Sequence, residues 1–440
     1  MPRPAALATL ALIAAASLAA NTQTQTLPAL KNAFRDHFRV GVAINRTIPT
    51  ATDVKANNVD RALDQVRADT ATTLRHFDHV VAENDMKWEM IHPREGADGY
   101  DFAPADAFVE FGERHGMLII GHTLVWHGQT PAWVFSGDQV LPADPVPEGA
   151  PRPRWRGFDP TQPHATRDQL IARLREHIHT VVGRYRGRVH VWDVVNEAIS
   201  DRGEAILRET AWSRIIGPDF IALAFRFAHE ADPEAILRYN DYGLENPRKR
   251  DKALRLVREL LAQGVPVHAI GTQTHVGATS PSYEEMDLAL TELKSLGLPV
   301  HVTELDVNTA RRGQGGTGAD ITQNADATAG GLIAEADARA AEQWANLFRL
   351  FVKHRDAVKI VTFWGVNDGV SWRAAGRPLL FDADNRPKPG LPAVLAVARE
   401  AALKQPGPAQ AEAEATSLTS RSKPPGPASR RHILVPRPRK

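Results

Sequence analysis

The sequence predicts an α/β fold, most simply a single (β/α)8 TIM barrel over residues 26–404. Short runs rich in Val and Ile alternate with longer helical patterns, which is the order expected of repeated βα units. Several runs are almost continuously apolar, as in parallel strands that are buried on both faces. An open doubly wound sheet is the alternative, but no glycine-rich phosphate loop follows the first run.

The expected elements follow one another along the whole predicted domain. Helical patterns include Arg167–Tyr185 and Arg248–Gln263, and the second ends at Gly264, as a helix with a glycine C-cap would. The eight predicted strands are Phe38–Ile44, Phe77–Glu83, Leu118–Trp126, Val189–Asn196, Ala235–Asn240, Val267–His275, Pro299–Asp306 and Lys359–Trp364.

Length, charge and composition exclude several classes of protein. The chain has 440 residues, enough for one barrel of roughly 250 to 400 residues with insertions. Its formal net charge of +1 argues against a nucleic-acid binder, which normally has a basic face. The absence of cysteine excludes disulfides, thiolate catalysis and cysteine-ligated zinc.

The N-terminus predicts export from the cell. Arg3 precedes an apolar run, Ala5–Ala20, and polar residues follow it, which is the pattern of a secretory signal peptide over residues 1–20. A membrane anchor is the alternative, but the run is shorter than the roughly 20 apolar residues that a span needs. We therefore expect a periplasmic or extracellular protein without an integral membrane span after cleavage.

Three segments interrupt the alternation of strands and helices. Ser136–Ala165 is rich in Pro, Gly and charged residues, and Ala310–Gly331 is rich in Gly, Ala and Thr. Both follow predicted strands and are expected to be inserted loops over the catalytic face. Residues 405–440 are rich in Pro, Ala and Arg and end in a basic stretch, so we predict a disordered tail; weak attachment to an anionic surface is a second role for it.

Two predicted strands end in carboxylates. Trp192–Glu197 ends in Asn196 and Glu197, and the later strand carries Glu304. Burying such a charge costs several kcal/mol unless it is compensated. Glycosidic cleavage needs one carboxylic acid and one carboxylate on opposite sides of the bond, and two nearby carboxylates should give one of them a raised pKa. A salt bridge or a metal ligand is the alternative for Glu197 alone.

The alternation of side chains along strands places polar residues from several strands at one barrel mouth. Catalytic groups of parallel barrels lie at the carboxyl ends of the strands, and residues two apart share a face. These expected sets are His122 with Leu124 and Trp126, Gln273 with His275, Glu304 with Asp306, and Thr362 with Trp364.

Five motifs follow one another along the predicted barrel: Glu83-Asn84-Asp85-Met86-Lys87-Trp88, Gly121 to His127, Trp192 to Glu197, Thr303-Glu304-Leu305-Asp306 and Trp364 to Arg373. In this order they resemble glycoside hydrolase family 10, the retaining endo-1,4-β-xylanases. The resemblance covers roughly Thr26 to Lys404, and the combination of motifs is far more specific than any one of them.

The resemblance implies a role for each residue of the carboxylate pair and its surroundings. Glu197 would be the acid/base and Glu304 the nucleophile. Asn196 would hydrogen-bond the 2-hydroxyl of the sugar, and His275, held by Asp306, would orient Glu304. The implied substrates are xylan and xylo-oligosaccharides, with no cofactor and no metal, and we expect a monomer.

The resemblance also implies a set of sugar-binding residues. Tryptophan rings offer flat apolar faces to sugars, although we assign Trp88 and Trp212 to the core. Tyr242 matches an aromatic residue on the leaving-group side. The matched positions that line the glycone subsites are Glu83, Asn84, Lys87, His122, Trp126, Gln129, Gln273, Trp364 and Trp372.

The chain departs from the family at two places, and rival functions stay open. The family usually has Ser where this chain has Gly128, and the insert Ser136–Ala165 is longer than usual. Rivals are a hydrolase of another β-1,4-glycan or of aryl glycosides, a non-catalytic glycan-binding barrel and a metal-dependent hydrolase. The presence of both glutamates disfavours the second, and the lack of a His-x-His or His-Glu-x-x-His motif disfavours the third.

Overall fold

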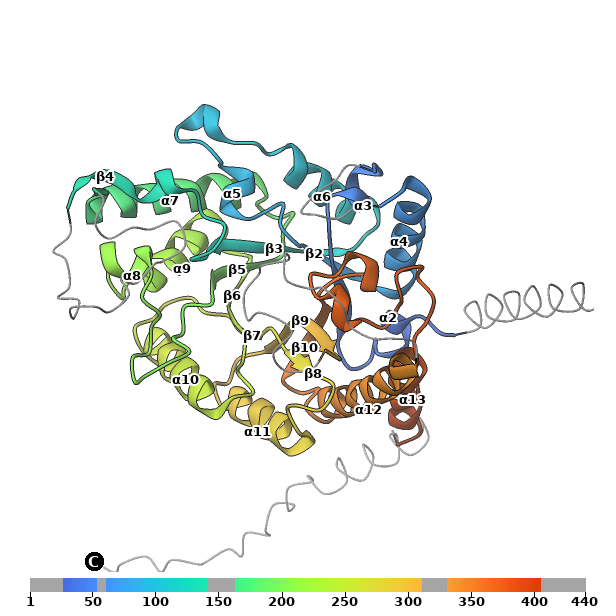
Figure 1. The fold of residues 1–440 in the computed structure, drawn as a ribbon. Helices are drawn as coiled ribbons and strands as arrows, with labels where there is room; N and C mark the ends of the chain where they lie inside the picture. The colour runs from blue at the N-terminus through green and yellow to red at the C-terminus, as the bar shows by residue number, and fades with distance from the viewer. Residues whose placement is uncertain (1–26, 54–60, 141–162, 311–330, 405–440) are drawn as a thin grey trace, which may run out of the picture. The chain divides into compact units, whose positions relative to one another are not determined.

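Eight parallel strands close into a barrel in the computed structural model, which describes residues 27–53, 61–140, 163–310 and 331–404. Each barrel strand pairs in parallel with its neighbours, and β10 (Val358–Phe363) closes the ring by pairing with both β9 (Val300–Asn308) and β1 (Arg39–Ile44). Figure 1 shows the larger helices arranged around this barrel. The predicted fold class is therefore confirmed.

The observed strands match the predicted ones closely. The predicted strand Val267–His275 is split into β7 and a short β8, His275–Gly277, because Thr274 between them has a left-handed backbone with φ of +60°. An extra strand, β4 (Ser136–Gln139), lies outside the barrel. The barrel strands are β1 Arg39–Ile44, β2 His79–Ala82, β3 Leu118–Val125, β5 Val191–Asn196, β6 Ile236–Asp241, β7 Ala269–Thr272, β9 Val300–Asn308 and β10 Val358–Phe363.

The helices begin where the sequence supplies caps for their free backbone N–H groups. Thr166 and Gln169 form a capping box at the start of α7 (Arg167–Arg184), and the Asn246 side chain accepts from two backbone N–H groups at the start of α10 (Pro247–Ala262). The larger helices are α4 Leu63–His76, α6 Ala103–Arg114, α7 Arg167–Arg184, α9 Phe220–Ala231, α10 Pro247–Ala262, α11 Tyr283–Lys294, α12 Gly331–Lys353 and α13 Gly390–Lys404, and the short ones are α2 Leu30–Ala33, α3 Thr47–Thr50, α5 Trp88–Ile91 and α8 Ala211–Ile215.

Within the described residues, the apolar side chains form a core of two parts. A large cluster fills the space between strands and helices, and it includes Trp88 and Trp212, as expected. A small cluster lies inside the barrel; among its members are Val81, Ile120 and Trp364. Each buried side chain contributes about 1.5–3 kcal/mol through removal of apolar surface from water. The barrel interior is thus a packed support for the mouth above it.

One expected face assignment is wrong. Leu124 was expected to share a face with His122, but it packs in the large outer cluster together with Val125. The reason is an irregularity in register between β3 and β5, where His122 pairs with Asp193 but Val125 pairs with Val195. Three residues of β3 therefore span two of β5, and the alternation of faces shifts by one position.

A buried ion pair in the barrel interior supports the mouth. The Arg238 guanidinium donates to both oxygens of Asp193, with N–O distances of 2.6 and 2.9 Å, and its Nη1 donates to His301. His122 Nδ1 lies 3.0 Å from the Asp193 carboxylate. Burial favours the neutral acid, but Arg238 and His122 outweigh it and lower the pKa of Asp193 to about 2. Asp193 therefore stays ionised and holds His122 in place.

Several expectations fall on residues that the structure does not describe. The signal peptide, residues 1–20, and the tail, residues 405–440, lie outside the described ranges, as do most of the insert Ser136–Ala165 and of the loop Ala310–Gly331. Among the described helices, none is long and apolar enough to cross a membrane.

Candidate active site

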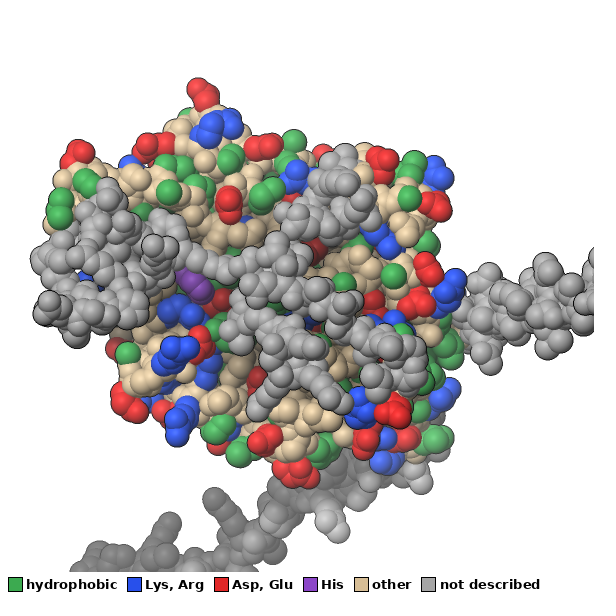
Figure 2. Space-filling view, viewed as in Figure 1, with side chains coloured by type: hydrophobic (Ala, Val, Ile, Leu, Met, Phe, Trp, Pro, Cys, Tyr) green, Lys and Arg blue, Asp and Glu red, His purple; other side chains and the backbone are tan. Residues whose placement is uncertain are grey.

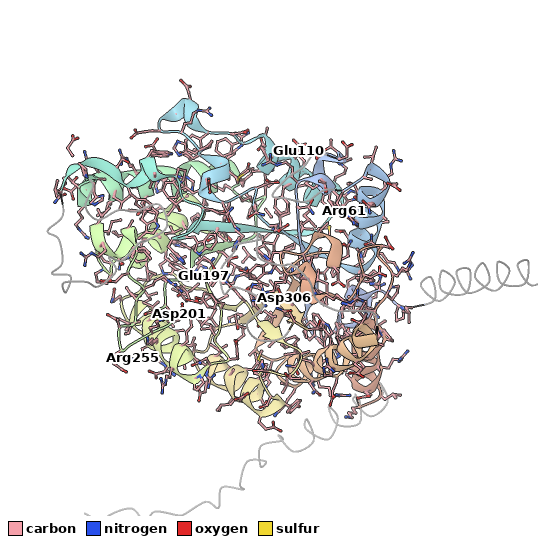
Figure 3. All side chains as sticks on the ribbon, in the orientation of Figure 1. Arg61, Glu110, Glu197, Asp201, Arg255 and Asp306 are labelled. Atoms are coloured by element: carbon pink, nitrogen blue, oxygen red, sulfur yellow. The ribbon has the colours of Figure 1, made fainter. Side chains whose placement is uncertain are left out.

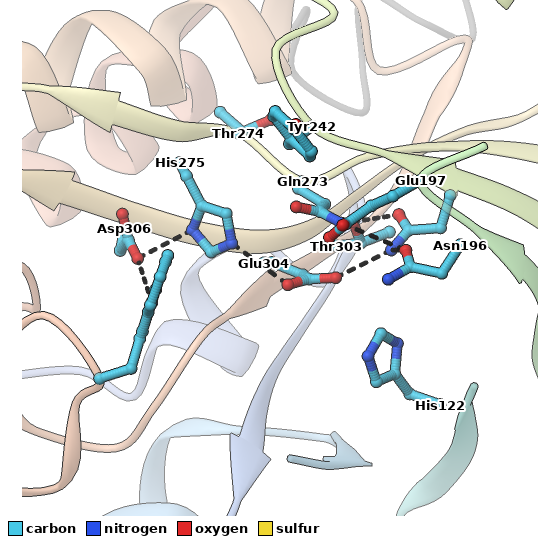
Figure 4. Close-up of polar contacts among 12 residues, drawn as sticks. His122, Asn196, Glu197, Tyr242, Gln273, Thr274, His275, Thr303, Glu304 and Asp306 are labelled. Atoms are coloured by element: carbon cyan, nitrogen blue, oxygen red, sulfur yellow. Dashed lines mark hydrogen bonds and ion pairs between the residues drawn. The ribbon is translucent and has the colours of Figure 1, made fainter. Parts of the chain in front are cut away.

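The carboxylate pair lies at the carboxyl ends of strands on opposite sides of the mouth. Glu197 follows β5 directly, and its φ of +59° turns the chain sharply away from the strand direction. Glu304 lies within β9, and its backbone N–H donates to the Gln273 carbonyl of the neighbouring segment. Both carboxylates lie in one group of polar side chains, shown in Figure 4. The predicted convergence is present.

Glu197 is hydrogen-bonded at both carboxylate oxygens. Trp126 Nε1 donates to Oε2 at 2.8 Å, and Gln273 Nε2 donates to Oε1 at 3.0 Å. Burial pushes the pKa of Glu197 up, but the charge of nearby His127 and these two donors outweigh burial, so the pKa lies below its ordinary value. The expectation of a raised pKa on the acid is therefore wrong for this site without substrate, because the donors favour the ionised form.

Glu304 ends a chain of charged side chains. His275 Nε2 lies 3.2 Å from Glu304 Oε2, and His275 Nδ1 lies 2.8 Å from Asp306 Oδ2. The predicted bridge of one imidazole between two carboxylates is thus present. Burial opposes the imidazolium, but Asp306 and Glu304 outweigh burial and raise the pKa of His275 to about 9. His275 is therefore a cation at neutral pH and donates to both carboxylates.

Arg373 completes this chain with a second cation. Its Nη1 donates to Asp306 Oδ1 at 3.0 Å, and Trp372 Nε1 donates to Oδ2 at 3.0 Å. Asp306 is fully buried, yet the charges of His275 and Arg373 overcome the effect of burial and lower its pKa. The side chains Glu304, His275, Asp306 and Arg373 form a series in which acidic and basic groups alternate, so the buried Asp306 has a cation on either side.

Three amide side chains connect the two carboxylates. Asn240 Nδ2 donates to Glu304 Oε1 at 2.8 Å and to Asn196 Oδ1 at 3.0 Å, while Gln273 Nε2 donates to the same Asn196 oxygen at 3.2 Å and to Glu197. Because the Asn196 oxygen already accepts two hydrogen bonds, its NH2 group is the part left to donate to a sugar hydroxyl. This hydrogen-bond network therefore sets the relative positions of both carboxylates. It also fixes the Asn196 amide, which is predicted to hydrogen-bond the 2-hydroxyl of the sugar.

Asn240 needs a glycine beside it. A Cβ added at Gly271 on β7 would lie 2.5 Å from Asn240 Oδ1, which is closer than a Cβ carbon comes to another heavy atom. The Asn240 oxygen accepts from Thr303 Oγ1 at 2.6 Å, so the amide cannot swing away without losing this bond. The missing side chain at Gly271 is thus what lets Asn240 reach both Glu304 and Asn196.

A second polar group lies where β2 and β3 end. Lys87 Nζ donates to Asn84 Oδ1 and Gln129 Oε1, both at 2.9 Å, and lies 5.0 Å from the centre of the Trp126 ring. Glu83 lies beside Lys87, and burial raises the pKa of Glu83 to about 7 despite the lysine charge. The structure thus brings together five of the residues predicted to line the glycone subsites.

The remaining predicted residues lie around these two groups. The rings of His122 and Trp364 meet edge to face with centroids 5.1 Å apart, and the Trp372 ring lies 5.0 Å from that of His275. Tyr242 follows β6 and donates its hydroxyl to Asp201 Oδ2 at 2.6 Å. Every predicted site residue thus has a defined place at the mouth; their contacts with a sugar stay predictions.

Sequence reasoning missed Asn240 and Arg373 as functional residues. Asn240 ends a predicted strand, as Asn196 does, and this position is the signal that could have found it. Arg373 lies at the end of the last motif, in a loop whose path the sequence did not predict. Within the described ranges no group of three or more His, Asp or Glu side chains is placed to hold a metal ion. The chemistry that this site supports is proton transfer and nucleophilic attack by two carboxyl groups.

Known proteins resemble this chain over most of its length. A model of glycosyl hydrolase family 10 matches residues 29–397. Endo-1,4-beta-xylanase B of Paenibacillus barcinonensis is 37% identical, and the match covers 82% of this chain and 96% of the relative. An endo-1,4-beta-xylanase of Geobacillus stearothermophilus is also 37% identical, and the match covers 83% of this chain and 97% of the relative. A crystal structure of an intracellular xylanase from Thermoanaerobacterium saccharolyticum shows a glutamate-to-alanine mutant with xylotetraose. It is 34% identical to this chain, covers 84% of this chain and 98% of its own, and has a TM-score of 0.67.

The charge of His275 predicts an unusual titration. The pKa of its imidazole should be about 9 and not the ordinary histidine value of 6.5. NMR of 15N-labelled protein can follow this titration, and His275→Asn assigns the signal. A raised pKa means that this group's contribution to stability is complete below pH 6.5 and is lost as the pH rises through about 9.

Arg373 provides the comparison for that titration. The Arg373 charge lowers the pKa of His275, so Arg373→Gln should move the titration to higher pH. Titration of the wild-type imidazole near pH 6.5, or a downward shift in Arg373→Gln, would contradict the alternating charge series.

Proposed function

The chain belongs to glycosyl hydrolase family 10 and is a retaining endo-1,4-β-xylanase, and we propose that Glu197 is its acid/base and Glu304 its nucleophile. The observation that carries this assignment is the shared amide: Asn196 Oδ1 accepts from Asn240, which also donates to Glu304, and from Gln273, which also donates to Glu197. A retaining pair requires carboxyl groups about 5–5.5 Å apart, and the three amides that meet at Asn196 Oδ1 hold Glu197 and Glu304 in one site.

In the first step Glu304 attacks the anomeric carbon of a bound xylose. The glycosidic C–O bond breaks, its electron pair goes to the leaving oxygen, and the proton of Glu197 joins that oxygen. Glu304 is suited to this attack because it is only 5% exposed, and Asn240 and His275 hold its two carboxylate oxygens in place. The hydrogen bond from Asn196 to the 2-hydroxyl would strengthen as charge develops on the sugar ring.

In the second step Glu197 works as the base. Formation of the ester removes the negative charge of Glu304, which leaves a net positive charge on the series through His275, Asp306 and Arg373. That charge lowers the pKa of Glu197 further, so the carboxylate can take a proton from water. The water oxygen bonds to the anomeric carbon, the ester bond breaks, and the configuration is retained.

The low pKa of Glu197 in the free site requires the substrate to change it. A bound sugar excludes water from the carboxyl group and places the glycosidic oxygen, a hydrogen-bond acceptor, beside it. Both effects favour the protonated form. We therefore propose that the substrate itself prepares Glu197 as an acid.

The two roles can be separated by azide products. With 2,4-dinitrophenyl β-xylobioside, whose leaving group needs no proton, Glu197→Ala should form the glycosyl-enzyme normally and give β-xylobiosyl azide when azide is added. On xylan the activity of the same variant should fall by about 10²- to 10⁴-fold because acid catalysis is missing. Glu304→Ala should be inactive on xylan and give α-xylobiosyl azide by direct displacement.

The control for both variants is Glu110→Ala, which changes an exposed glutamate of α6 far from the mouth (Figure 3) and should behave as wild type. If the anomeric configurations of the two azides were exchanged, the roles of Glu197 and Glu304 would be exchanged as well. NMR of the isolated azides decides between these outcomes.

The hydrogen bond from Trp126 makes a separate prediction about pH. This donor lowers the pKa of Glu197, so Trp126→Phe should raise it and move the basic limb of kcat/KM, which reports the free enzyme, to higher pH. Trp126→Phe also changes the ring expected to contact the sugar, which raises KM by the same factor at every pH and does not move the basic limb of the profile. A limb that stays in place or moves to lower pH would contradict this account of Glu197.

We further propose that the protein is secreted, since residues 1–20 have the pattern of a signal peptide. Family membership does not decide this point, because one structural neighbour is described as intracellular. N-terminal sequencing of the native protein should give a chain that begins just after Ala19 or Ala20, in the periplasm or the medium. Recovery of the protein from the cytoplasm with residues 1–20 intact would contradict secretion.

A further inference from the structure

The backbone of Glu197 is held in a conformation that the residue alone would not favour. Its φ is +59°, in the left-handed region that a residue with a Cβ does not favour. Two contacts fix its peptide groups: the Glu197 N–H donates to the Asn240 carbonyl at 2.9 Å, and the Glu197 carbonyl accepts from Arg208 Nε at 3.2 Å. The direction of the carboxyl group therefore depends on both contacts.

Arg208 lies on the returning arm of the loop that follows β5. Its own backbone N–H donates to the Ala198 carbonyl at 2.8 Å, and Ile199 and Leu207 form an antiparallel bridge. The guanidinium is thus presented beside Glu197 by a paired turn of chain. Lys252 Nζ donates to the carbonyls of Ser200, Arg202 and Gly203 and ties down the tip of that turn.

The other end of the guanidinium reaches the leaving-group side. Arg208 Nη2 donates to Tyr242 Oη at 2.8 Å and to Asp201 Oδ2 at 2.9 Å, and Tyr242 Oη donates to the same Asp201 oxygen. One planar group thereby connects the acid/base backbone with the aromatic residue expected to meet the leaving sugar. A planar guanidinium can make these contacts together, whereas the single ammonium of lysine cannot.

Neighbouring charged groups restrict the movement of the three side chains Arg208, Tyr242 and Asp201. Lys249 Nζ lies 2.8 Å from Asp201 Oδ1, 3.0 Å from Asp241 Oδ1 and 3.2 Å from the centre of the Tyr242 ring. Figure 3 places Asp201 close to Glu197 at the mouth, and Figure 2 shows Lys and Arg side chains gathered on the same side, over α10. The position of Tyr242 is therefore transmitted to Glu197 through groups that have little freedom.

We propose that Arg208 is a positioning residue for proton donation by Glu197, and that it aligns the acid with the sugar bound against Tyr242. The proposal rests on the assignment of Glu197 as the acid/base. In this proposal Arg208 acts by holding the Glu197 carbonyl and the Tyr242 hydroxyl with one guanidinium, and not through the Glu197 carboxyl group. Loss of Arg208 should therefore impair proton transfer to the leaving group and leave attack by Glu304 intact.

The test compares two substrates that differ in their need for a proton. For xylotriose, whose leaving group is an alcohol, kcat/KM of Arg208→Gln should fall by about 10- to 100-fold, since a misplaced catalytic group costs up to ~10²-fold. For 2,4-dinitrophenyl β-xylobioside, kcat/KM reports nucleophilic attack alone and should stay within about threefold of wild type. Arg208→Lys should resemble Arg208→Gln because charge without the planar fork does not restore the geometry.

Tyr242→Phe removes one hydroxyl and no charge, and it should give the same pattern with a smaller loss. It also keeps the proposal testable if the Arg208 variants fail to fold, which circular dichroism would show. Arg188→Gln, which breaks a two-pronged ion pair with Glu113 remote from the mouth, should leave both substrates unaffected.

Equal losses on both substrates, or no loss on xylotriose, would overturn the positioning role of Arg208. The assignment of Glu197 is tested apart from it by Glu197→Ala on the same pair of substrates. If kcat/KM of Glu197→Ala falls equally for xylotriose and for 2,4-dinitrophenyl β-xylobioside, the acid/base assignment fails. If it shows the selective loss and Arg208→Gln does not, only the proposal for Arg208 fails.

Discussion

The structure of the mouth depends on one constraint: carboxylates that are removed from water must keep their charge. Glu304 and Asp306 lie in β9 almost without solvent contact, where an isolated carboxylate would take up a proton. His275 and Arg373 supply the compensating positive charges, so the series is neutral as a whole. Removal of any one member would leave a buried charge without its partner, which is far more costly than loss of a surface pair.

The rest of the site follows from how this series is fixed in space. Asn240 joins Glu304 to Asn196, and Gln273 joins Asn196 to Glu197, so the amides transfer the position of one carboxylate to the other. Below them the buried pair of Asp193 and Arg238 holds His122. These side chains come from adjacent strands of a closed barrel, whose pairing fixes the distances between strand ends. The fold therefore determines the catalytic geometry before any substrate arrives.

The sequence predicted most of the fold and the main features of the site. Continuous apolar runs identify buried parallel strands, the alternation of faces put Glu304 and Asp306 on one side of their strand, and the family resemblance implied that His275 lies between them. Alternation fails where strands are irregular: the register shift near Leu124 and the left-handed Thr274 depend on contacts between strands that no local pattern contains. Arg373 could not be predicted because its role depends on a loop folding back over Asp306. The lowered pKa of Glu197 likewise arises from groups distant in sequence, namely the charge of His127 and the donors Gln273 and Trp126.

The most direct test of this account is the identity of the residue that bonds to the sugar. In 2,4-dinitrophenyl 2-deoxy-2-fluoro-β-xylobioside, fluorine slows both steps by destabilising the oxocarbenium-like transition state, while the good leaving group favours the first, so the covalent intermediate accumulates. Mass spectrometry of a proteolytic digest should then show one xylobiosyl adduct, on the peptide that contains Glu304, with the ester on that side chain. An adduct on Glu197, or steady hydrolysis without any adduct, would contradict the account.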